Sequence, residues 1–360
     1  MQPTISIRLG NEMSDMITMA HGSGGTQMSW LIEDVFAKTY GNELLLTGDD
    51  AAVLELVALQ VPGARLAFST DSYVVTPHFF AGGDIGRLAV CGTVNDIATS
   101  GARPLYLSLG FILEEGFSLD NLRKIVTSIA LSAKEAGVSI VTGDTKVVEH
   151  GKGDGIYINS SGVGVVEPAV NLGGRNCQPG DAILLSGSLG DHGITIISTR
   201  EGLSFEASVA SDAAPLNTLV QDVLAVAPLT RCFRDPTRGG LASTLNELAQ
   251  QSHTCMLVDE ETVPIKDVVR GACDLLGYDV YHVANEGKMV AIVAPEQAEK
   301  ALVAMRQSAY GQDAALIGTV ASFDEPGLPQ TTISQAYVRT SLGTLRVMDV
   351  LTGEQLPRIC

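Results

Sequence analysis

The sequence predicts an α+β protein built from two mixed α/β modules of comparable size, followed by a flexible tail. The chain has 360 residues, enough for two domains that each bury a core. Its composition, 45% hydrophobic with 38 glycines and only 5% aromatics, is typical of a folded protein rich in tight turns. Strand-like and helix-like segments alternate along both halves, which favours mixed layers of strands and helices.

The first module is expected over residues 21–170, after an N-terminal extension of residues 1–20. A strand-like run at 66–70 ends at Asp71, a helix-like segment covers about 84–100, and an apolar run spans 106–113. The clearest helix lies between Ser118, which can cap its start, and Gly137, which can end it. A short strand at 139–142 and a strand at 155–166 complete the module.

The second module is expected over residues 175–323, because glycine, asparagine and proline mark a boundary near 172–180. A strand at 181–186 leads into the glycine-rich segment 187–193 and a helix, and a second helix begins at Gly239-Gly240. Strands are expected on both sides of 285–288, then a helix at 295–307 and a last strand at 314–320. Residues 324–360 are predicted to form a mobile tail.

The net charge of −18 argues against binding to nucleic acid or to an anionic membrane surface, since both require a basic surface. No apolar stretch reaches transmembrane length, and Arg8, Glu12 and Asp15 occur where a signal peptide needs an apolar core, so a cytoplasmic protein is expected. The six cysteines are scattered, which favours neither a disulfide framework nor a structural zinc site.

The sequence stops at Cys360, which gives a thiol on the last residue of the tail. Such a thiol could be a reach-in nucleophile or a carrier arm, with an ionisation that depends on the pocket that receives it. A free cysteine on a frayed end is the alternative, and the residues alone favour it. No residues follow the cysteine, so it is not a prenylation signal.

Several aspartates occur beside turns or element ends, as clustered ligands for a hard cation would. Mg²⁺ prefers oxygen ligands and usually takes one or two protein carboxylates, leaving positions for phosphate and water. Each aspartate alone is better explained as a helix cap or turn residue. Taken together, they favour a magnesium site; they are Asp49, Asp50, Asp71, Asp96, Asp144 and Asp235.

Glycine-rich segments at 21–25, 187–193 and 238–240 could bring backbone amides to phosphate oxygens. Each segment alone is weak evidence. A segment such as 21–25 is more often a flexible connector, and His192 in segment 187–193 can be interpreted as a polar loop residue. The sequence contains neither a P-loop motif nor a Rossmann fingerprint, so any ATP must bind through another architecture.

Seven short motifs, taken in order, resemble the ATP-using superfamily of aminoimidazole ribonucleotide synthetase, thiamine-monophosphate kinase and selenophosphate synthetase. Within it, the terminus Pro357-Arg-Ile-Cys360 resembles the HypE family of hydrogenase maturation factors. The resemblance covers roughly residues 20–320 and the last few positions, but not 1–15, and 324–351 match too loosely to assign. The motifs are His21-Gly-Ser-Gly-Gly, Gly48-Asp-Asp-Ala-Ala-Val, Ser69-Thr-Asp-Ser-Tyr, Val94-Asn-Asp-Ile-Ala, Gly143-Asp-Thr-Lys, Arg234-Asp-Pro-Thr-Arg-Gly-Gly and Asn285-Glu-Gly-Lys.

The resemblance implies modules of the aminoimidazole ribonucleotide synthetase type, with the N-terminal sheets pairing in a homodimer and ATP bound near that junction. It also implies an ATP-dependent carbamoyl dehydratase that uses Mg²⁺. The carbamoyltransferase HypF would place a carbamoyl group on the terminal thiol, and this chain would convert S-carbamoyl to S-cyanide. The cyanide would pass to iron held by HypC and HypD for nickel–iron hydrogenase assembly.

The same resemblance carries the residue roles, and general chemistry agrees with them. Dehydration needs a phosphorylated carbamoyl oxygen and a base within reach of the nitrogen. Cys360 would carry the group, and Glu286 and Lys146 are the candidate catalytic residues beside it. Mg²⁺ would be held among Asp49, Asp50, Asp71, Asp96 and Asp235. The residues expected to bind ATP or the phosphates are Asp50, Asp71, Asn95, Asp96, Gly143, Asp144, Asp235, Thr237, Arg238 and Gly239.

Two other functions fit parts of the sequence. A small-molecule kinase or synthetase of the same superfamily would share the aspartates but have no use for a terminal cysteine. A noncatalytic carrier or scaffold would use the tail but would not need both Glu286 and the phosphate-facing glycines. The dehydratase accounts for both features.

Overall fold

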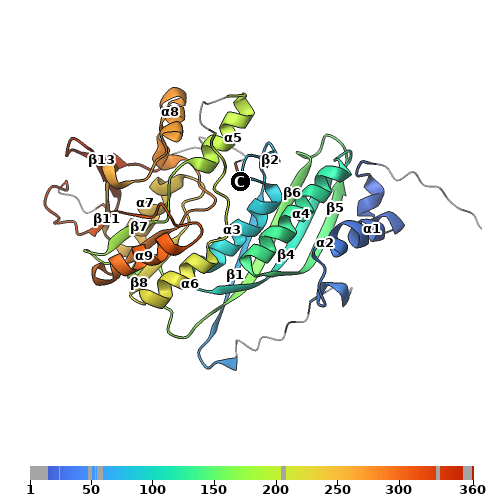
Figure 1. Cartoon of the computed structure of the whole chain (residues 1–360), viewed down its shortest axis with the longest axis horizontal. Helices are drawn as coiled ribbons and strands as arrows, with labels where there is room; N and C mark the ends of the chain where they lie inside the picture. Colours follow the sequence, from blue (N-terminus) through green and yellow to red (C-terminus); the bar gives the residue numbers. More distant parts are fainter. Residues whose placement is uncertain are drawn as a thin grey trace, which may run out of the picture.

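The computed structural model describes residues 15–23, 25–47, 51–52, 54, 60–203, 208–329, 333–351 and 359–360. Two sheets, each with its own helices, form the two halves of the molecule (Figure 1). The end of the chain, marked C in Figure 1, lies between the halves beside β2 (Phe79–Phe80) and α5 (Asp191–Glu201). The last residue is therefore at the junction of the two halves.

The N-terminal half contains a four-stranded sheet of order β1-β6-β4-β5. Only the β4–β5 pair is parallel; the β1–β6 and β4–β6 pairs are antiparallel. A two-stranded hairpin, β2 with β3 (Gly83–Asp84), precedes the first long helix. The main strands are β1 (Arg65–Tyr73), β4 (Arg103–Glu114), β5 (Ser139–Val148) and β6 (Ile156–Val166).

Helices α3 (Ile85–Thr99) and α4 (Leu119–Ala136) pack against each other and against one face of this sheet. Ser118 caps α4 as expected, accepting a hydrogen bond from the Asn121 amide at 3.4 Å, and Asp84 caps α3, accepting one from the Arg87 amide at 2.9 Å. Gly137 ends α4 with a φ of 70°, which an L side chain rarely adopts. Both helix predictions are confirmed.

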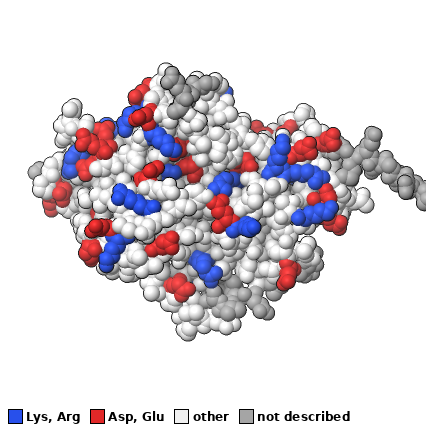
Figure 2. All heavy atoms as spheres, in the orientation of Figure 1, with Lys and Arg blue, Asp and Glu red and all other residues white. Residues whose placement is uncertain are grey.

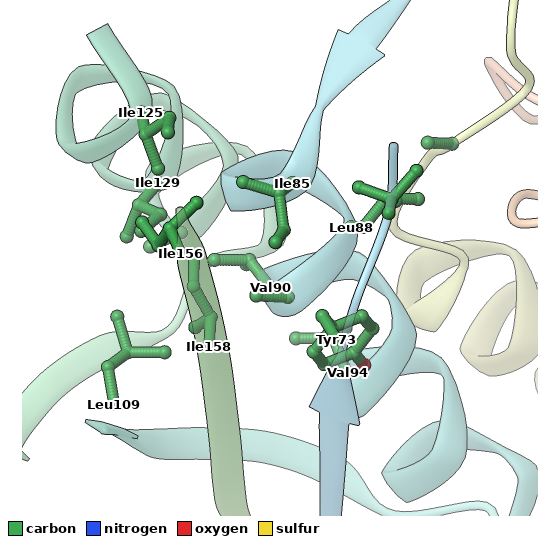
Figure 3. Packing of buried hydrophobic residues seen from close by; sticks show 14 of the residues in the cluster. Tyr73, Ile85, Leu88, Val90, Val94, Leu109, Ile125, Ile129, Ile156 and Ile158 are labelled. Atoms are coloured by element: carbon green, nitrogen blue, oxygen red, sulfur yellow. The ribbon is translucent and has the colours of Figure 1, made fainter. Parts of the chain in front are cut away.

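The two faces of the first sheet differ in burial because strand side chains alternate between them. Figure 3 shows the covered face, where Leu109 and Ile158 of the sheet pack with Val90 and Val94 of α3. On the opposite face Phe68 and Leu66 of β1 are 70% and 53% exposed. That face therefore presents apolar side chains to solvent in a single protomer.

A run of short helices precedes the first sheet. It contains a 3-10 helix at Met19–Gly22, α1 (Thr26–Leu31), a π-helical segment at Ile32–Ala37, α2 (Lys38–Tyr40) and a 3-10 helix at Leu45–Thr47. Phe36 from this run packs on Phe111 of β4, with ring centroids 4.9 Å apart. The run thus lies against the β4–β5 side of the N-terminal core.

The C-terminal half contains a seven-stranded sheet of order β13-β12-β9-β11-β7-β10-β8. The β12–β9 pair is parallel and the other pairs are antiparallel. Its strands are β7 (Ala182–Leu185), β8 (Thr230–Arg234), β9 (Cys255–Asp259), β10 (Val290–Val293), β11 (Ala315–Ala321), β12 (Ala336–Arg339) and β13 (Leu345–Met348). Its helices are α5, α6 (Asn217–Val226), α7 (Gly240–Ser252), α8 (Asp267–Leu276) and α9 (Ala298–Gln307). Short 3-10 helices occur at Gly174–Asn176, Glu260–Thr262, Val280–His282 and Pro295–Gln297.

The central strands of the second sheet are buried on both faces. Ile183 and Leu185 of β7 join a core with α7, whereas Leu184 between them joins a core with α6 and α9. Every residue of β7 and β10 is buried. This explains why these strands read as continuous apolar runs instead of alternating patterns.

Several sequence expectations need correction. β1 continues through Asp71 to Tyr73, and β5 continues through Gly143 to Val148, so these polar residues lie within strands and not after them. A 3-10 helix, not a strand, precedes 285–288. Residues 336–339 and 345–348, expected in the mobile tail, form β12 and β13. Each is only four residues long, and β12 is held by pairing with β9, which lies far away in the sequence.

The charged surface and the helices can be compared with the expectation that the protein binds neither nucleic acid nor membrane. On the face drawn in Figure 2, Lys and Arg side chains are interspersed with Asp and Glu side chains. Among the described residues, no helix combines the length and apolar character needed to cross a bilayer.

Candidate active site

The last two residues of the chain dock in the interior. Ile359 is 4% exposed, and its carbonyl oxygen lies 2.7 Å from Nε2 of His192 on α5. A main-chain carboxylate oxygen of Cys360 accepts a hydrogen bond from the Val74 amide, just after β1, at 3.2 Å. The main chain of the terminus is therefore held from both halves of the molecule.

The Cys360 thiol lies beside the carboxyl of Glu286, near enough for each group to shift the pKa of the other, and Oε1 of Glu286 is buried without a hydrogen-bond partner. Burial raises the pKa of Cys360 well above its usual range, and the neighbouring Glu286 charge raises it further. Burial also raises the pKa of Glu286, together with the negative charges of Asp212, Asp235 and Asp71. In this docked state burial favours the neutral forms of both the Cys360 thiol and the Glu286 carboxyl.

The segment 285–288 holds Glu286 rigidly. The Asn285 side chain accepts from the Gly190 amide at 2.8 Å and donates to the Pro236 carbonyl at 3.0 Å. The Glu286 amide donates to the Asp212 carboxylate at 3.1 Å. At Gly287 an added Cβ would lie 1.7 Å from the Asp212 carbonyl oxygen, so glycine is required there. The buried carboxyl of Glu286 is thus aimed by contacts that a flexible loop would lack.

Three aspartates join Glu286 in what we call the acidic cluster, formed by Asp71, Asp96, Asp235 and Glu286. Burial and the nearby charge of Asp96 raise the pKa of Asp235 to about 7. The pKa of Asp96 is raised mainly by burial, and its carboxylate accepts a hydrogen bond from Ser69 at 2.8 Å. The cluster is therefore negatively charged and poorly compensated by cations.

The acidic cluster contains three of the five predicted magnesium ligands. Asp49 and Asp50 lie outside the described residues. Among the residues that are described, no three acidic, histidine or cysteine side chains lie close enough together to hold one ion. The oxygen-rich, uncompensated charge nevertheless suits a hard cation that takes one or two carboxylates from the protein.

The segment 237–239 lies at the edge of the cluster. Arg238 is 4.0 Å from the Asp71 carboxylate, and its charge acts to lower the pKa of the Cys360 thiol against the larger effect of burial. Gly239 and Gly240 have φ angles of 77° and 61°, and helix α7 begins there. The Arg238 side chain is mostly exposed, so it is available to an approaching anion.

Other predicted residues lie elsewhere. Both polar groups of the Asn95 side chain are used within the protein, accepting from the Leu216 amide at 2.7 Å and donating to the Ala214 carbonyl at 3.0 Å. Lys146, Gly143 and Asp144 are on β5, at the opposite edge of the first sheet from Asp71. Three strand spacings separate these edges, roughly 14 Å at about 4.8 Å each. Lys146 is thus not beside Glu286 within one protomer.

A pocket of about 140 Å³ opens next to β5. Gly143 and Asp144 line it on one side. The other walls are largely apolar and aromatic and include Met28, Phe36 and Tyr40. This mixture of apolar walls and a few polar groups is typical of small-molecule sites.

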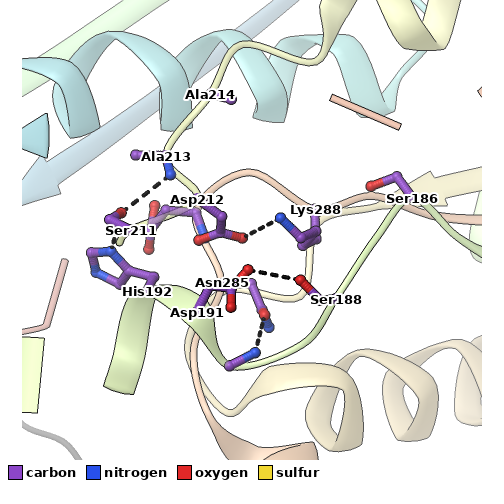
Figure 4. Close-up of polar contacts among 12 residues, drawn as sticks. Ser186, Ser188, Asp191, His192, Ser211, Asp212, Ala213, Ala214, Asn285 and Lys288 are labelled. Carbon is purple, nitrogen blue, oxygen red and sulfur yellow. Dashed lines mark hydrogen bonds and ion pairs between the residues drawn. The ribbon is translucent and has the colours of Figure 1, made fainter. Parts of the chain in front are cut away.

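A second set of buried carboxylates, which we call the paired carboxylates, consists of Asp191 and Asp212. Lys266 lies 2.8 Å from Asp191. Lys288 lies 3.1 Å from Asp212 (Figure 4). The Lys288 charge opposes burial and the pKa of Asp212 is lowered. All four residues line a cavity of about 540 Å³. The sequence analysis did not single out this set, because only folding brings its members together.

The glycine-rich segments also differ from expectation. In 187–193, the amides of Leu189, Gly190 and Gly193 bond to the carbonyls of Pro264 and Ala284 and to the Asn285 side chain. They are not free to bind phosphate. The interpretation of His192 as a polar loop residue is wrong, since its side chain is fully buried against the docked terminus. His21 is also buried, and its Nδ1 accepts from the Thr18 amide at 3.0 Å.

Comparison with known proteins gives a consistent picture. Residues 48–166 match the N-terminal domain model of the AIR synthase related proteins, and residues 178–327 match the C-terminal domain model. The chain is 54% identical to the carbamoyl dehydratase HypE of Azotobacter vinelandii, covering 96% of this chain and 97% of that protein. It is 44% identical to the carbamoyl dehydratase HypE of Escherichia coli, with coverages of 96% and 99%.

Solved structures agree with these relatives. The crystal structure of hydrogenase maturation protein HypE in complex with ATP is similar with a TM-score of 0.90 and 49% identity, over 95% of this chain and 99% of that one. A HypE–HypF complex is similar with a TM-score of 0.75 and 45% identity, over 89% and 99%. Thiamine-monophosphate kinase from Stenotrophomonas maltophilia, at 22% identity and a TM-score of 0.62 over 87% and 96%, shares the fold.

Proposed function

The chain belongs to the AIR synthase related family and, within it, to the HypE group, and from this premise we propose that it is an ATP-dependent carbamoyl dehydratase. Its substrate is an S-carbamoyl group on its own Cys360, which it converts to S-cyanide as the source of the cyanide ligand of nickel–iron hydrogenase. The observation that carries the proposal is the docking of Cys360 against the buried carboxyl of Glu286.

The proposed reaction has two steps, and atoms and charges are conserved in each. The carbamoyl oxygen attacks the γ-phosphorus of ATP and ADP leaves, while the nitrogen loses one proton. The second nitrogen proton is then removed as the carbon–oxygen bond breaks, which releases phosphate and leaves the carbon–nitrogen triple bond. A carbamoyl oxygen is a poor leaving group, so phosphorylation is needed before elimination.

Glu286 is the base that accepts a nitrogen proton in this proposal. It lies beside the docked Cys360 thiol with its Oε1 buried and without a hydrogen-bond partner, so it would be available to a group attached to that sulfur. Its raised pKa makes the ionised form a stronger base than an ordinary glutamate. Arg238, near Asp71 and mostly exposed, would bind the phosphoryl group together with Thr237.

ATP binding is supported by two features. Gly143 and Asp144 line the pocket beside β5, whose apolar and aromatic walls suit a nucleotide base. Mg²⁺ would take one or two ligands from among Asp71, Asp96 and Asp235, together with Asp49 and Asp50, and would neutralise phosphate charge when bound. Uncompensated negative charge around Asp235 supports a cation there.

A homodimer is part of the proposal. Phe68 and Leu66 leave an apolar surface on the uncovered face of the first sheet, which a second copy would bury. Lys146 lies on the far edge of that sheet from Asp71, so its assignment to this site requires Lys146 of the partner subunit. The ATP site would then lie near the subunit junction.

The carbamoylating partner is a HypF protein, as the solved HypE–HypF complex of a relative supports. Cys360 would reach that partner only when the tail leaves the pocket, since its thiol is largely enclosed when docked. The cyanide would then pass to iron on HypC and HypD. We place these encounters in the cytoplasm.

Intact mass spectrometry of the C-terminal peptide tests the proposal. Cys360 should gain one carbamoyl group with HypF and its substrates, then lose the mass of one water when Mg-ATP is added. Cys360→Ser should show neither change. A carbamoylated peptide that is stable to Mg-ATP, or ADP formation driven by a small-molecule acceptor without Cys360, would favour the small-molecule kinase.

A further inference from the structure

His192 makes the shortest contact between the docked terminus and the body of the protein. It lies in the first turn of α5 and is fully buried. Its Nε2 is 2.7 Å from the Ile359 carbonyl oxygen, and its Nδ1 is 2.8 Å from the Ser211 hydroxyl. Both ring nitrogens therefore have partners, and only one of the two belongs to the terminus.

The partners of His192 decide which nitrogen carries the proton. A carbonyl oxygen only accepts, so Nε2 must donate to Ile359, and Nδ1 of the neutral ring then accepts from Ser211. The Ser211 oxygen accepts in turn from the Ala213 amide at 3.2 Å, which directs its own proton toward the ring (Figure 4). Phe80 packs edge-on against the imidazole, with centroids 5.5 Å apart. The ring is thus held as a single tautomer in a single orientation.

His192 contacts the main chain of the tail and not the reacting thiol. The second anchor, from the Val74 amide to the main-chain carboxylate of Cys360, is also a main-chain contact. Neither contact depends on what the sulfur carries. The free, carbamoylated and cyanated forms of the tail would therefore dock through the same two bonds, while the sulfur substituent faces Glu286.

We propose that His192 is a positioning residue that holds the tail in the dehydration pocket by donating a hydrogen bond to the Ile359 carbonyl, whatever group Cys360 carries. Loss of this bond would shift the tail toward its undocked state. The effect of His192 on docking of the tail does not depend on the reaction that the protein catalyses. Its effect on dehydration rests on the proposed function.

Alkylation of Cys360 in the resting protein measures docking without ATP or partners. His192→Phe keeps an aromatic ring but removes both hydrogen bonds, and should raise the rate of Cys360 alkylation by about three- to tenfold, the equivalent of one lost hydrogen bond. His192→Gln retains an N–H donor and should lie between this variant and the natural protein. The five other cysteines are buried, so their protection reports an intact fold in the same sample.

His282→Phe is the matched control. His282 also contacts a main-chain carbonyl, that of Asp349, with its Nε2 at 2.7 Å, but it lies away from the terminus. This variant should leave Cys360 alkylation unchanged. If His192→Phe alkylates at the natural rate while the other cysteines stay protected, His192 does not hold the tail.

Single-turnover dehydration of the carbamoylated protein tests the second part. His192→Phe should slow cyanide formation by a similar three- to tenfold factor, without slowing carbamoylation by the partner, which requires the undocked tail. Cyanide formation at the natural rate would refute the positioning role. If the natural protein forms no cyanide, the proposed function fails, and the alkylation rates still decide whether His192 holds the tail.

Discussion

The acidic cluster and the paired carboxylates meet at the same segment, 285–288, yet they differ in one respect. Asp212 and Asp191 each have a lysine within 3.1 Å, and the pKa of Asp212 is lowered. In the acidic cluster the pKa values of Asp96, Asp235 and Glu286 are raised, because burial and mutual repulsion outweigh the nearby arginines.

This difference separates the paired carboxylates, whose charge is balanced by lysines within the protein, from the acidic cluster, whose charge is not balanced. A buried ion pair balances the charge of its carboxylate within the protein. A buried group of acids without sufficient cations is stable only if it binds protons or positive charge. Perturbation of this kind marks a functional site, and the acidic cluster contains the proposed base and metal ligands.

The largest effect is expected from Glu286→Gln. The amide keeps the shape of the side chain but cannot accept a proton, so dehydration should fall by roughly 10²- to 10⁴-fold. Carbamoylation of Cys360 by the partner should be unaffected. The mass of the C-terminal peptide after Mg-ATP gives both results, and a variant that still forms cyanide at the natural rate would exclude Glu286 as the base.

Breaking the paired carboxylates should affect stability instead of chemistry. Lys288→Met leaves the Asp212 carboxylate buried without its cation and should reduce the free energy of unfolding by about 3–5 kcal/mol, measured in urea. Lys266→Met is the matched control: its side chain is 49% exposed, and the loss should be well below that. Equal losses would show that burial does not separate the two pairs.

Asp235→Asn should act in the opposite direction and stabilise the protein free of metal and nucleotide. The pKa of Asp235 is about 7 in the folded state, above its value in the unfolded chain, so Asp235 costs stability progressively as pH rises toward 7. The variant should gain up to about 4 kcal/mol at pH 8 and less than half of that at pH 5. Melting temperatures at both pH values check this, with Asp212→Asn expected to lose stability. A loss for both variants would remove the distinction between the two groups.

The smallest expected effect is a pH dependence of the dehydration step. Because the pKa of Glu286 is raised, the ionised base is scarce at low pH, and the single-turnover rate should rise by about tenfold per pH unit until that pKa is passed. Quenched reactions of carbamoylated protein between pH 6 and 9 would measure it. A flat profile would mean that Glu286 is already ionised when the tail is carbamoylated.

Local patterns predicted the elements that depend on neighbouring residues. Ser118, Gly137 and the apolar face between them are sufficient for α4, since caps and periodicity act within a few turns. β12 was missed because it depends on pairing with β9, which lies about eighty residues away along the chain, and β13 was missed because it depends in turn on pairing with β12. The long extensions of β1 and β5 through polar residues have the same cause: partner strands supply the hydrogen bonds that the local sequence does not specify.

Residue types and motif order were sufficient to predict which chemical groups take part in the site. The terminal thiol, the aspartates beside turns and the Asn285-Glu-Gly-Lys motif can all be recognised in the sequence without coordinates. The sequence did not indicate which carboxylates would be paired with a lysine in the folded protein. Lys288 is two residues from Glu286 but pairs with Asp212, and His192 binds a residue 167 positions away. Burial and charge pairing depend on distances through space, so folding alone decided which acids became ion pairs and which remained in need of a cation.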